Sequence, residues 1–321
     1  TPQGEVNAGR EMVSRMAATY AATGGDPVLA ITVLGAGTGG GDKASSEAIQ
    51  QARAGGDYYA IMVIPATFTA SQAAAAAGQG EAAPVEVTVN QGKGPAVAAQ
   101  VQTALEATLT AAGVATVFDY VDPVPAGVPA AAQQLTALFT FMLSMIGSVL
   151  TFFVSRAPRC ASRAGRRRAA LTQLAFAAGL SLLVAAFVPF LLRGIGGAAV
   201  PYWTALGFLW PAAFALMALF TACLTLWTPL GAVVILTCLA CGMATANLPY
   251  EMLPTVWQDW FYPWAPQARV ADAARQIYFA RAGAWNSDSL YFLLVGLSGL
   301  AVHLGCWLAP RKLARASSRK S

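Results

Sequence analysis

The sequence of 321 residues contains little charge, and long parts of it contain no acidic residue. Asp, Glu, Lys and Arg make up 11% of it, against about 25% in soluble proteins. Between Asp122 and Glu251 there is no Asp or Glu at all. Soluble proteins place acidic side chains on their exposed helices, so the gap excludes an ordinary water-soluble fold for this part of the chain. It is typical of a chain embedded in a membrane.

The residues of common catalytic and metal sites are also scarce. The only histidine is His303, in an apolar segment, where we favour a packing role over a proton relay. The five cysteines all follow residue 159. Cys238 and Cys241 share a helical face, but small residues for helix packing explain them better than a zinc or redox site. We therefore expect no enzymatic activity, no cofactor and no metal.

One glycine-rich motif, GAGTGG at residues 35–40, has the spacing of a dinucleotide-binding loop. Because no helix begins directly after it, no helix N-terminus is in place to hold a pyrophosphate. A flexible loop is the favoured interpretation. No Walker sequence is present either, so the chain should not bind ATP. We expect no nucleic acid partner.

Five apolar windows are long enough to cross a bilayer, which takes about 20 residues. They comprise residues 135–154, 171–192, 202–227, 230–248 and 290–309. Together with 56% hydrophobic residues, they predict a transmembrane domain over residues 131–321. None of the windows contains a carboxylate, which argues against a carrier coupled to protons or sodium.

Basic residues predict the orientation, because short loops rich in Lys and Arg stay cytoplasmic. One such group lies in a loop at residues 155–170, and the other in the tail at 310–321. Both then lie inside, and all acidic residues outside. The loop could contact either a cytoplasmic partner or anionic lipid. We favour the interpretation that its arginines set the topology and contact anionic lipid. Its candidate residues are Arg156, Arg159, Arg163, Arg166, Arg167 and Arg168.

Residues 1–130 are rich in Ala and Gly, without long apolar runs, and predict a small mixed α/β domain outside the cell. Translocating them requires a signal peptide or an earlier membrane helix, which we expect to precede Thr1. Pro123, Pro125 and Pro129 mark a linker into the membrane. Helices are predicted at 11–20, 45–54 and 96–111, and strands at 28–34, 58–64, 85–89 and 115–120.

The external segment at residues 249–289, between the fourth and fifth windows, is aromatic. Aromatic residues with polar tips collect at the headgroup level, so this elbow should lie on or dip into the outer leaflet. The segment is either only an aromatic belt at the membrane surface or an element that takes part in the function of the protein. Its candidate residues are Glu251, Trp257, Trp260, Phe261, Trp264 and Arg275.

Several motifs resemble the phage-infection-protein (YhgE/Pip) family of membrane proteins, which are related to type-2 ABC exporter permeases. Residues 55–69 read GGDYYAIMVIPATFT, similar to the signature of that family's external domain, and EAI at 47–49 is similar to its preceding helix. NLPYEMLP at 247–254, WAP at 264–266 and RQIY at 275–278 resemble its stretch between the last two spans. The resemblance covers nearly the whole chain.

The resemblance implies a sixth span ahead of the external domain, a homodimer, and a location in the bacterial cell membrane. It also implies export of a lipid-like or hydrophobic substrate or a cell-envelope component, driven by a separate ATPase subunit. The alternative is a scaffold that does not transport, such as a phage receptor or an exporter accessory protein. That protein would act by binding an external protein or phage through residues 1–130.

Overall fold

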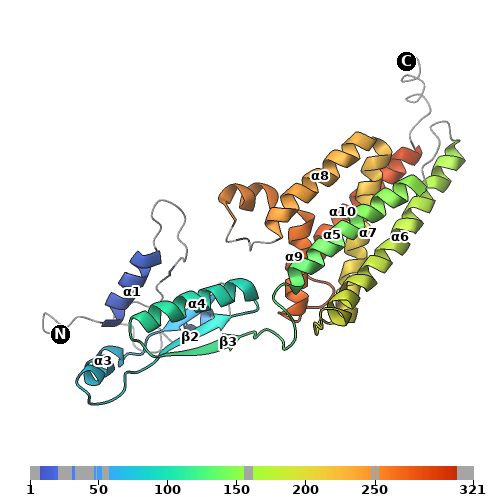
Figure 1. The fold of residues 1–321 in the computed structure, drawn as a ribbon. Helices are drawn as coiled ribbons and strands as arrows, with labels where there is room; N and C mark the ends of the chain where they lie inside the picture. The colour runs from blue at the N-terminus through green and yellow to red at the C-terminus, as the bar shows by residue number, and fades with distance from the viewer. Residues whose placement is uncertain are drawn as a thin grey trace. The chain divides into compact units, whose positions relative to one another are not determined.

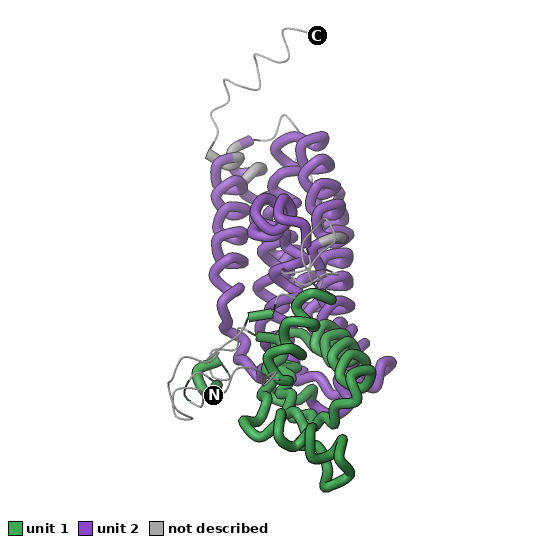
Figure 2. Tube along the Cα trace, turned by 90° about the vertical axis from the view of Figure 1, so that its left-hand side faces the viewer, with its two compact units in different colours: residues 1–124 green, residues 125–321 purple. Residues whose placement is uncertain are grey.

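The computed structural model describes residues 8–20, 31–32, 47, 49–52, 58–154, 162–246, 250 and 253–308. The chain forms two compact units, residues 1–124 and 125–321 (Figure 2). The boundary falls among the three prolines of the expected linker. Each unit is described separately.

The first unit is built around a three-stranded mixed sheet in the order β1-β2-β3. β1 (Ala60–Val63) pairs antiparallel with β2 (Val85–Asn90), and β2 pairs parallel with β3 (Thr116–Val121). α4 (Pro95–Ala111) connects the two parallel strands. Two further helices of this unit are α1 (Ala8–Tyr20) and α3 (Phe68–Ala76).

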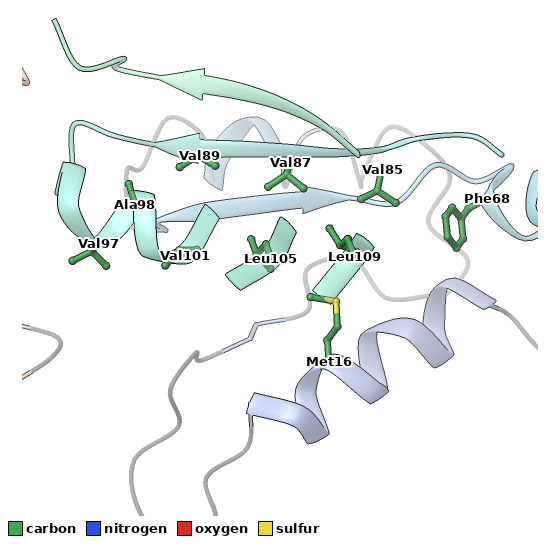
Figure 3. Packing of buried hydrophobic residues seen from close by; sticks show 10 residues of the cluster. All are labelled: Met16, Phe68, Val85, Val87, Val89, Val97, Ala98, Val101, Leu105 and Leu109. Atoms are coloured by element: carbon green, nitrogen blue, oxygen red, sulfur yellow. The ribbon is translucent and has the colours of Figure 1, made fainter. Parts of the chain in front are cut away.

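Alternation of side chains along β2 produces the core of this unit. Val85, Val87 and Val89 are fully buried, because residues two apart lie on the same face of a strand. They pack against the apolar face of α4, which includes Leu105 and Leu109 (Figure 3). Pro95 begins α4 with a preset φ, and Gly113 follows it at a φ of 70°.

The strands expected at 58–64, 85–89 and 115–120 and the helix expected at 96–111 correspond to β1, β2, β3 and α4. Residues 47 and 49–52 are helical, within the helix expected at 45–54. The strand expected at 28–34 and the loop at 35–40 lie almost wholly outside the described residues. α3 was not predicted. Its alanine-rich sequence has a strong helix propensity, but it lacks the amphipathic period by which a helix is recognised in a sequence.

The second unit is helical. Its helices are α5 (Ala132–Val154), α6 (Arg163–Gly194), α7 (Tyr202–Leu226), α8 (Thr228–Thr245), the π-helical turn η2 (Trp257–Phe261), α9 (Pro266–Tyr278) and α10 (Ser289–Leu308). Three of them, α5, α6 from Arg167 onward and α7, are long and apolar enough to span a membrane. α8 and α10 are apolar but shorter. The three candidate spans indicate a membrane protein.

α6 differs from its expected extent, because it begins at Arg163 rather than near residue 171. Ser162 caps the helix, its side chain accepting a hydrogen bond from the Gly165 amide at 3.1 Å. Arginine is a good helix former, so the helix continues through the basic residues that follow. Part of the expected loop at 155–170 is therefore helix, while residues 155–161 lie outside the described residues.

α7 is the central helix of this unit and packs against α5, α6, α8 and α10 (Figure 1). Glycines allow the closest approaches. A Cβ atom at Gly299 of α10 would lie 2.7 Å from the Leu219 backbone nitrogen and 2.8 Å from the Ala218 carbonyl carbon. Because these are backbone atoms, the two helices touch directly at this point.

Gly299→Ala should therefore force α7 and α10 apart and lower the free energy of unfolding by about 1–3 kcal/mol. Gly305→Ala is the matched control, since a Cβ atom there meets nothing within 4 Å. That variant should gain stability by about 0.5–1 kcal/mol, because alanine is the better helix former. Denaturation in detergent followed by tryptophan fluorescence measures both, because all eight tryptophans follow residue 200. Equal stability of the two variants would contradict the proposed contact.

Candidate functional site

The second unit contains a partly open cavity of about 240 Å³ between α5, α8 and α9. α5 and α8 each pack against α9. The lining residues are Ala131, Gln134, Leu135, Leu138, Phe141, Met142, Gly242, Met243, Ala246 and Gln267. Among the described residues of this lining none is charged, and the polar side chains are the amides of Gln134 and Gln267.

The cavity opens on the side of the helices. Leu135 and Leu138 of α5 are 37% and 38% exposed, and Met243 of α8 is 50% exposed. Apolar side chains exposed on helices of this kind face lipid when the helices lie in a membrane. The opening is therefore suited to a hydrophobic molecule that enters from the side.

Gln267 provides the most buried polar group of the cavity, with 4% of its surface exposed. It is the second residue of α9, after Pro266, so the start of the helix points its side chain toward α8. Its Nε2 donates a hydrogen bond to the Cys238 carbonyl oxygen at 2.9 Å. Its Oε1 is buried without a hydrogen-bond partner in the described part of the chain.

Gly242 makes room for this amide. A Cβ atom at Gly242 would overlap Cδ, Oε1 and Nε2 of Gln267. The amide therefore lies directly against the backbone of α8. Any larger residue at position 242 would displace Gln267 and change the wall of the cavity.

A polar network on the other face of α9 joins it to the start of α10. Arg269 pairs with Asp288 at 3.4 Å, and its Nη2 donates to the Pro263 carbonyl oxygen at 3.0 Å. Gln276 donates to the same Asp288 carboxylate at 3.1 Å. Burial raises the pKa of Asp288, while Arg269 opposes this change. These contacts hold α9, and with it Gln267, in place.

Two tyrosines anchor α9 further. Tyr278 lies 3.0 Å from the Thr136 hydroxyl of α5, which itself donates to the Ala132 carbonyl, so Tyr278 is the donor between them. Burial raises the pKa of Tyr278 to about 12, which keeps this hydroxyl protonated. Tyr262 donates to Asp272 at 2.7 Å, and burial raises its pKa too.

The arginines predicted at the basic loop do not form one described cluster. Arg156 and Arg159 lie outside the described residues, and Arg163 and Arg166 are described only as backbone in the first turns of α6. Arg167 and Arg168 are exposed on the same helix. Their role as a partner or lipid contact stays a prediction.

The elbow residues are partly brought together. The rings of Trp257 and Phe261 lie 4.8 Å apart, and those of Phe261 and Trp264 lie 5.9 Å apart. Trp260 is 72% exposed, Arg275 pairs with Asp272 at 3.7 Å, and Glu251 lies outside the described residues. Whether these aromatic side chains meet lipid stays a prediction.

α9 was expected only as part of an interfacial elbow, yet most of its side chains are buried in the bundle. This burial is possible because Ala268, Ala271 and Ala274 are small and let α9 pack closely on its neighbours. Sequence reasoning missed Gln267 and Gly242. The available signal was an amphipathic pattern after Pro266 in which Gln267 falls on the otherwise apolar face.

Comparisons with known proteins do not identify the chain, since no family model, curated protein or solved structure matches it. Within the described residues, no group of three His, Cys, Asp or Glu side chains could hold a metal ion. The features that bear on function are therefore the cavity and the contacts that support it.

Removing Arg269 should loosen α9. Arg269→Ala leaves the buried carboxylate of Asp288 without its cation, and we expect it to lower the free energy of unfolding by about 2–3 kcal/mol. Arg193→Ala, at an exposed arginine of α6, should stay within about 0.5 kcal/mol of the parent. Tryptophan fluorescence during denaturation in detergent compares the two. If Arg269→Ala lowers the free energy of unfolding no more than Arg193→Ala does, the network does not hold α9 in place.

Proposed function

We propose that this chain is the membrane-embedded permease subunit of an exporter that moves a lipid-like or hydrophobic substrate. The observation that carries the proposal is the cavity that opens sideways between α5 and α8 and whose described lining residues carry no charge. A substrate that dissolves in the bilayer would reach such an opening without passing through water. The resemblance to type-2 ABC exporter permeases points to the same class of substrate.

In this proposal five helices cross the bacterial cell membrane, with residues 1–130 outside and the basic residues inside. α8, with 18 residues, is short for a bilayer of average thickness, but flanking aromatic residues can adapt such a helix to it. The cavity lies near the start of α5 and the end of α8. This topology places it in the outer half of the membrane.

The energy for export would come from a separate ATPase, because the sequence has no Walker motif. The exposed start of α6, with Arg167 and Arg168, is a candidate contact for acidic residues of that subunit. A homodimer is expected from the resemblance alone.

A scaffold or receptor that does not transport is the second candidate. It is favoured by β3, where Val117 is 52% exposed and Tyr120 is 39% exposed. Exposed apolar side chains on a strand are a common feature of protein contacts. In this case the first unit would bind an external protein or phage, and the helices would serve as the anchor.

Filling the cavity separates the two candidates. Ala246→Trp places a large side chain in the cavity and should abolish export, seen as loss of a lipid species from the outer surface of cells that depend on the variant. Ala301→Trp is the matched control, because Ala301 is exposed on α10 and its replacement should leave export unchanged.

Both variants must reach the membrane in amounts equal to the parent, which immunoblotting of membrane fractions measures. If cells that lack the protein altogether keep the same surface lipids as the parent, the permease proposal is wrong. The scaffold would then be the better description.

A further inference from the structure

β3 forms an open edge of the sheet in the first unit. It pairs with β2 on one side, and no described strand pairs with its other side (Figure 3). Val117 and Tyr120 of β3 are exposed, whereas β1, at the opposite edge, has no exposed residue. An open edge strand is a template for pairing with another polypeptide segment. β3 is therefore the described edge at which a further strand would join the sheet.

The backbone of β3 supplies the hydrogen-bonding groups that such pairing needs. The Val121 carbonyl accepts a hydrogen bond from the Gln91 amide at the end of β2, so the backbone groups of Val121 face β2. Successive residues of a strand point these groups to opposite sides. Those of Thr116, Phe118 and Tyr120 therefore point away from β2, toward the position of an added strand.

Asp119 occupies one of these outward donors. Its Oδ1 accepts a hydrogen bond from the Tyr120 amide at 2.9 Å. A cationic side chain beside Asp119 would pair with this carboxylate, because charge-assisted hydrogen bonds are stronger than neutral ones. The Tyr120 N–H would then be released to the carbonyl of an added strand. Pairing is therefore favoured for a segment that carries a basic residue at this point.

The face of the sheet on which Asp119 lies carries a second carboxylate. Glu86 of β2 is opposite Val117 in the register, and Asp119 follows two residues along β3 on the same face. Both acidic residues are exposed, and among the described residues neither forms an ion pair. Opposite charges on neighbouring strands stabilise a sheet. This face therefore suits basic side chains of an added strand.

The other face of β3 is apolar and fixed in position. Phe118 packs against the buried core below α4, and Gln102 of α4 donates a hydrogen bond to the Tyr120 hydroxyl at 3.0 Å. Because side chains alternate between the two faces of a strand, a segment next to β3 would place every second side chain beside these rings. Apolar residues suit those positions.

A second copy of this chain is a poor partner for the same edge. Antiparallel pairing of two β3 strands would bring the Glu86 and Asp119 carboxylates of both copies to one face of the joined sheet. Like charges on neighbouring strands destabilise a sheet. The acidic face thus disfavours self-pairing and favours a partner of opposite charge.

We propose that β3 binds an extended segment of a partner polypeptide in which apolar and basic residues alternate, and that this segment joins the sheet beside β3. Its basic side chains pair with Asp119 and Glu86, its apolar side chains lie beside Phe118 and Tyr120, and its backbone bonds to the outward groups of β3. This contact goes beyond the proposed export function and forms whether or not the chain exports a substrate.

The experiment titrates the full chain, in nanodiscs of phosphatidylcholine, with fluorescent peptides and measures anisotropy, with empty nanodiscs as the blank. In the first peptide valine and lysine alternate, and in the second glutamate replaces lysine. The third is the lysine peptide with its internal backbone nitrogens methylated, so that it cannot join a sheet. We expect the lysine peptide to bind about tenfold more tightly than either of the others. It should also slow hydrogen–deuterium exchange at Thr116, Phe118 and Tyr120.

Asp119→Lys should weaken binding of the lysine peptide by about fivefold, because an attraction between neighbouring strands becomes a repulsion. Glu106→Lys is the matched control, since Glu106 is exposed on α4 and the change in charge is the same. Binding to this variant should stay within about twofold of the parent. If Asp119→Lys does not fold, Asp119→Asn removes the charge but keeps an acceptor for the Tyr120 amide, and a loss of about threefold is expected.

Absence of binding by the lysine peptide would overturn the inference and leave the proposed export function in place. Equal binding of the methylated peptide would overturn it too, because the backbone of β3 would then not take part. Equal losses in the variants of Asp119 and Glu106 would show general attraction only, with the same consequence. Slow exchange at β3 without peptide, increasing with protein concentration in detergent, would identify a second copy as the occupant and contradict the proposal.

Discussion

The burial of α9 between α5 and α8 is the contact on which the site in the second unit depends. A short helix with polar residues can enter an apolar bundle only if those residues find partners. Arg269 and Gln276 share Asp288, Tyr278 donates to Thr136, and Gln267 reaches Cys238. Because these bonds form on several faces of α9, its position is strongly determined, and the cavity wall is determined with it.

Close contact between helices is the second requirement, and two of the glycines that provide it have different consequences. Gly299 brings the backbones of α7 and α10 together, which serves the stability of the bundle. Gly242 brings a side-chain amide against the backbone of α8, which serves the site. The absence of a Cβ atom thus lets two helices pack closely at Gly299, and it leaves room for the Gln267 amide at Gly242.

Much of the fold was predictable because it depends on local patterns. Alternation predicted β2, an amphipathic period predicted α4, and the long apolar windows predicted α5, α6, α7, α8 and α10. α6 begins before its apolar window, because Ser162 caps the helix and the arginines that follow continue it. α3 was missed because alanine alone gives no period.

The sequence by itself determined that the chain has a membrane-type half, since hydrophobic length and the missing acidic residues are properties of composition. Only the tertiary structure decided where a site lies. Gln267, Gly242 and Cys238 are ordinary residues in the sequence, and Met142 of the cavity wall lies 100 positions before Gly242. Their shared wall exists because α9 folds back into the bundle, and that contact between distant segments depends on packing rather than on any local pattern.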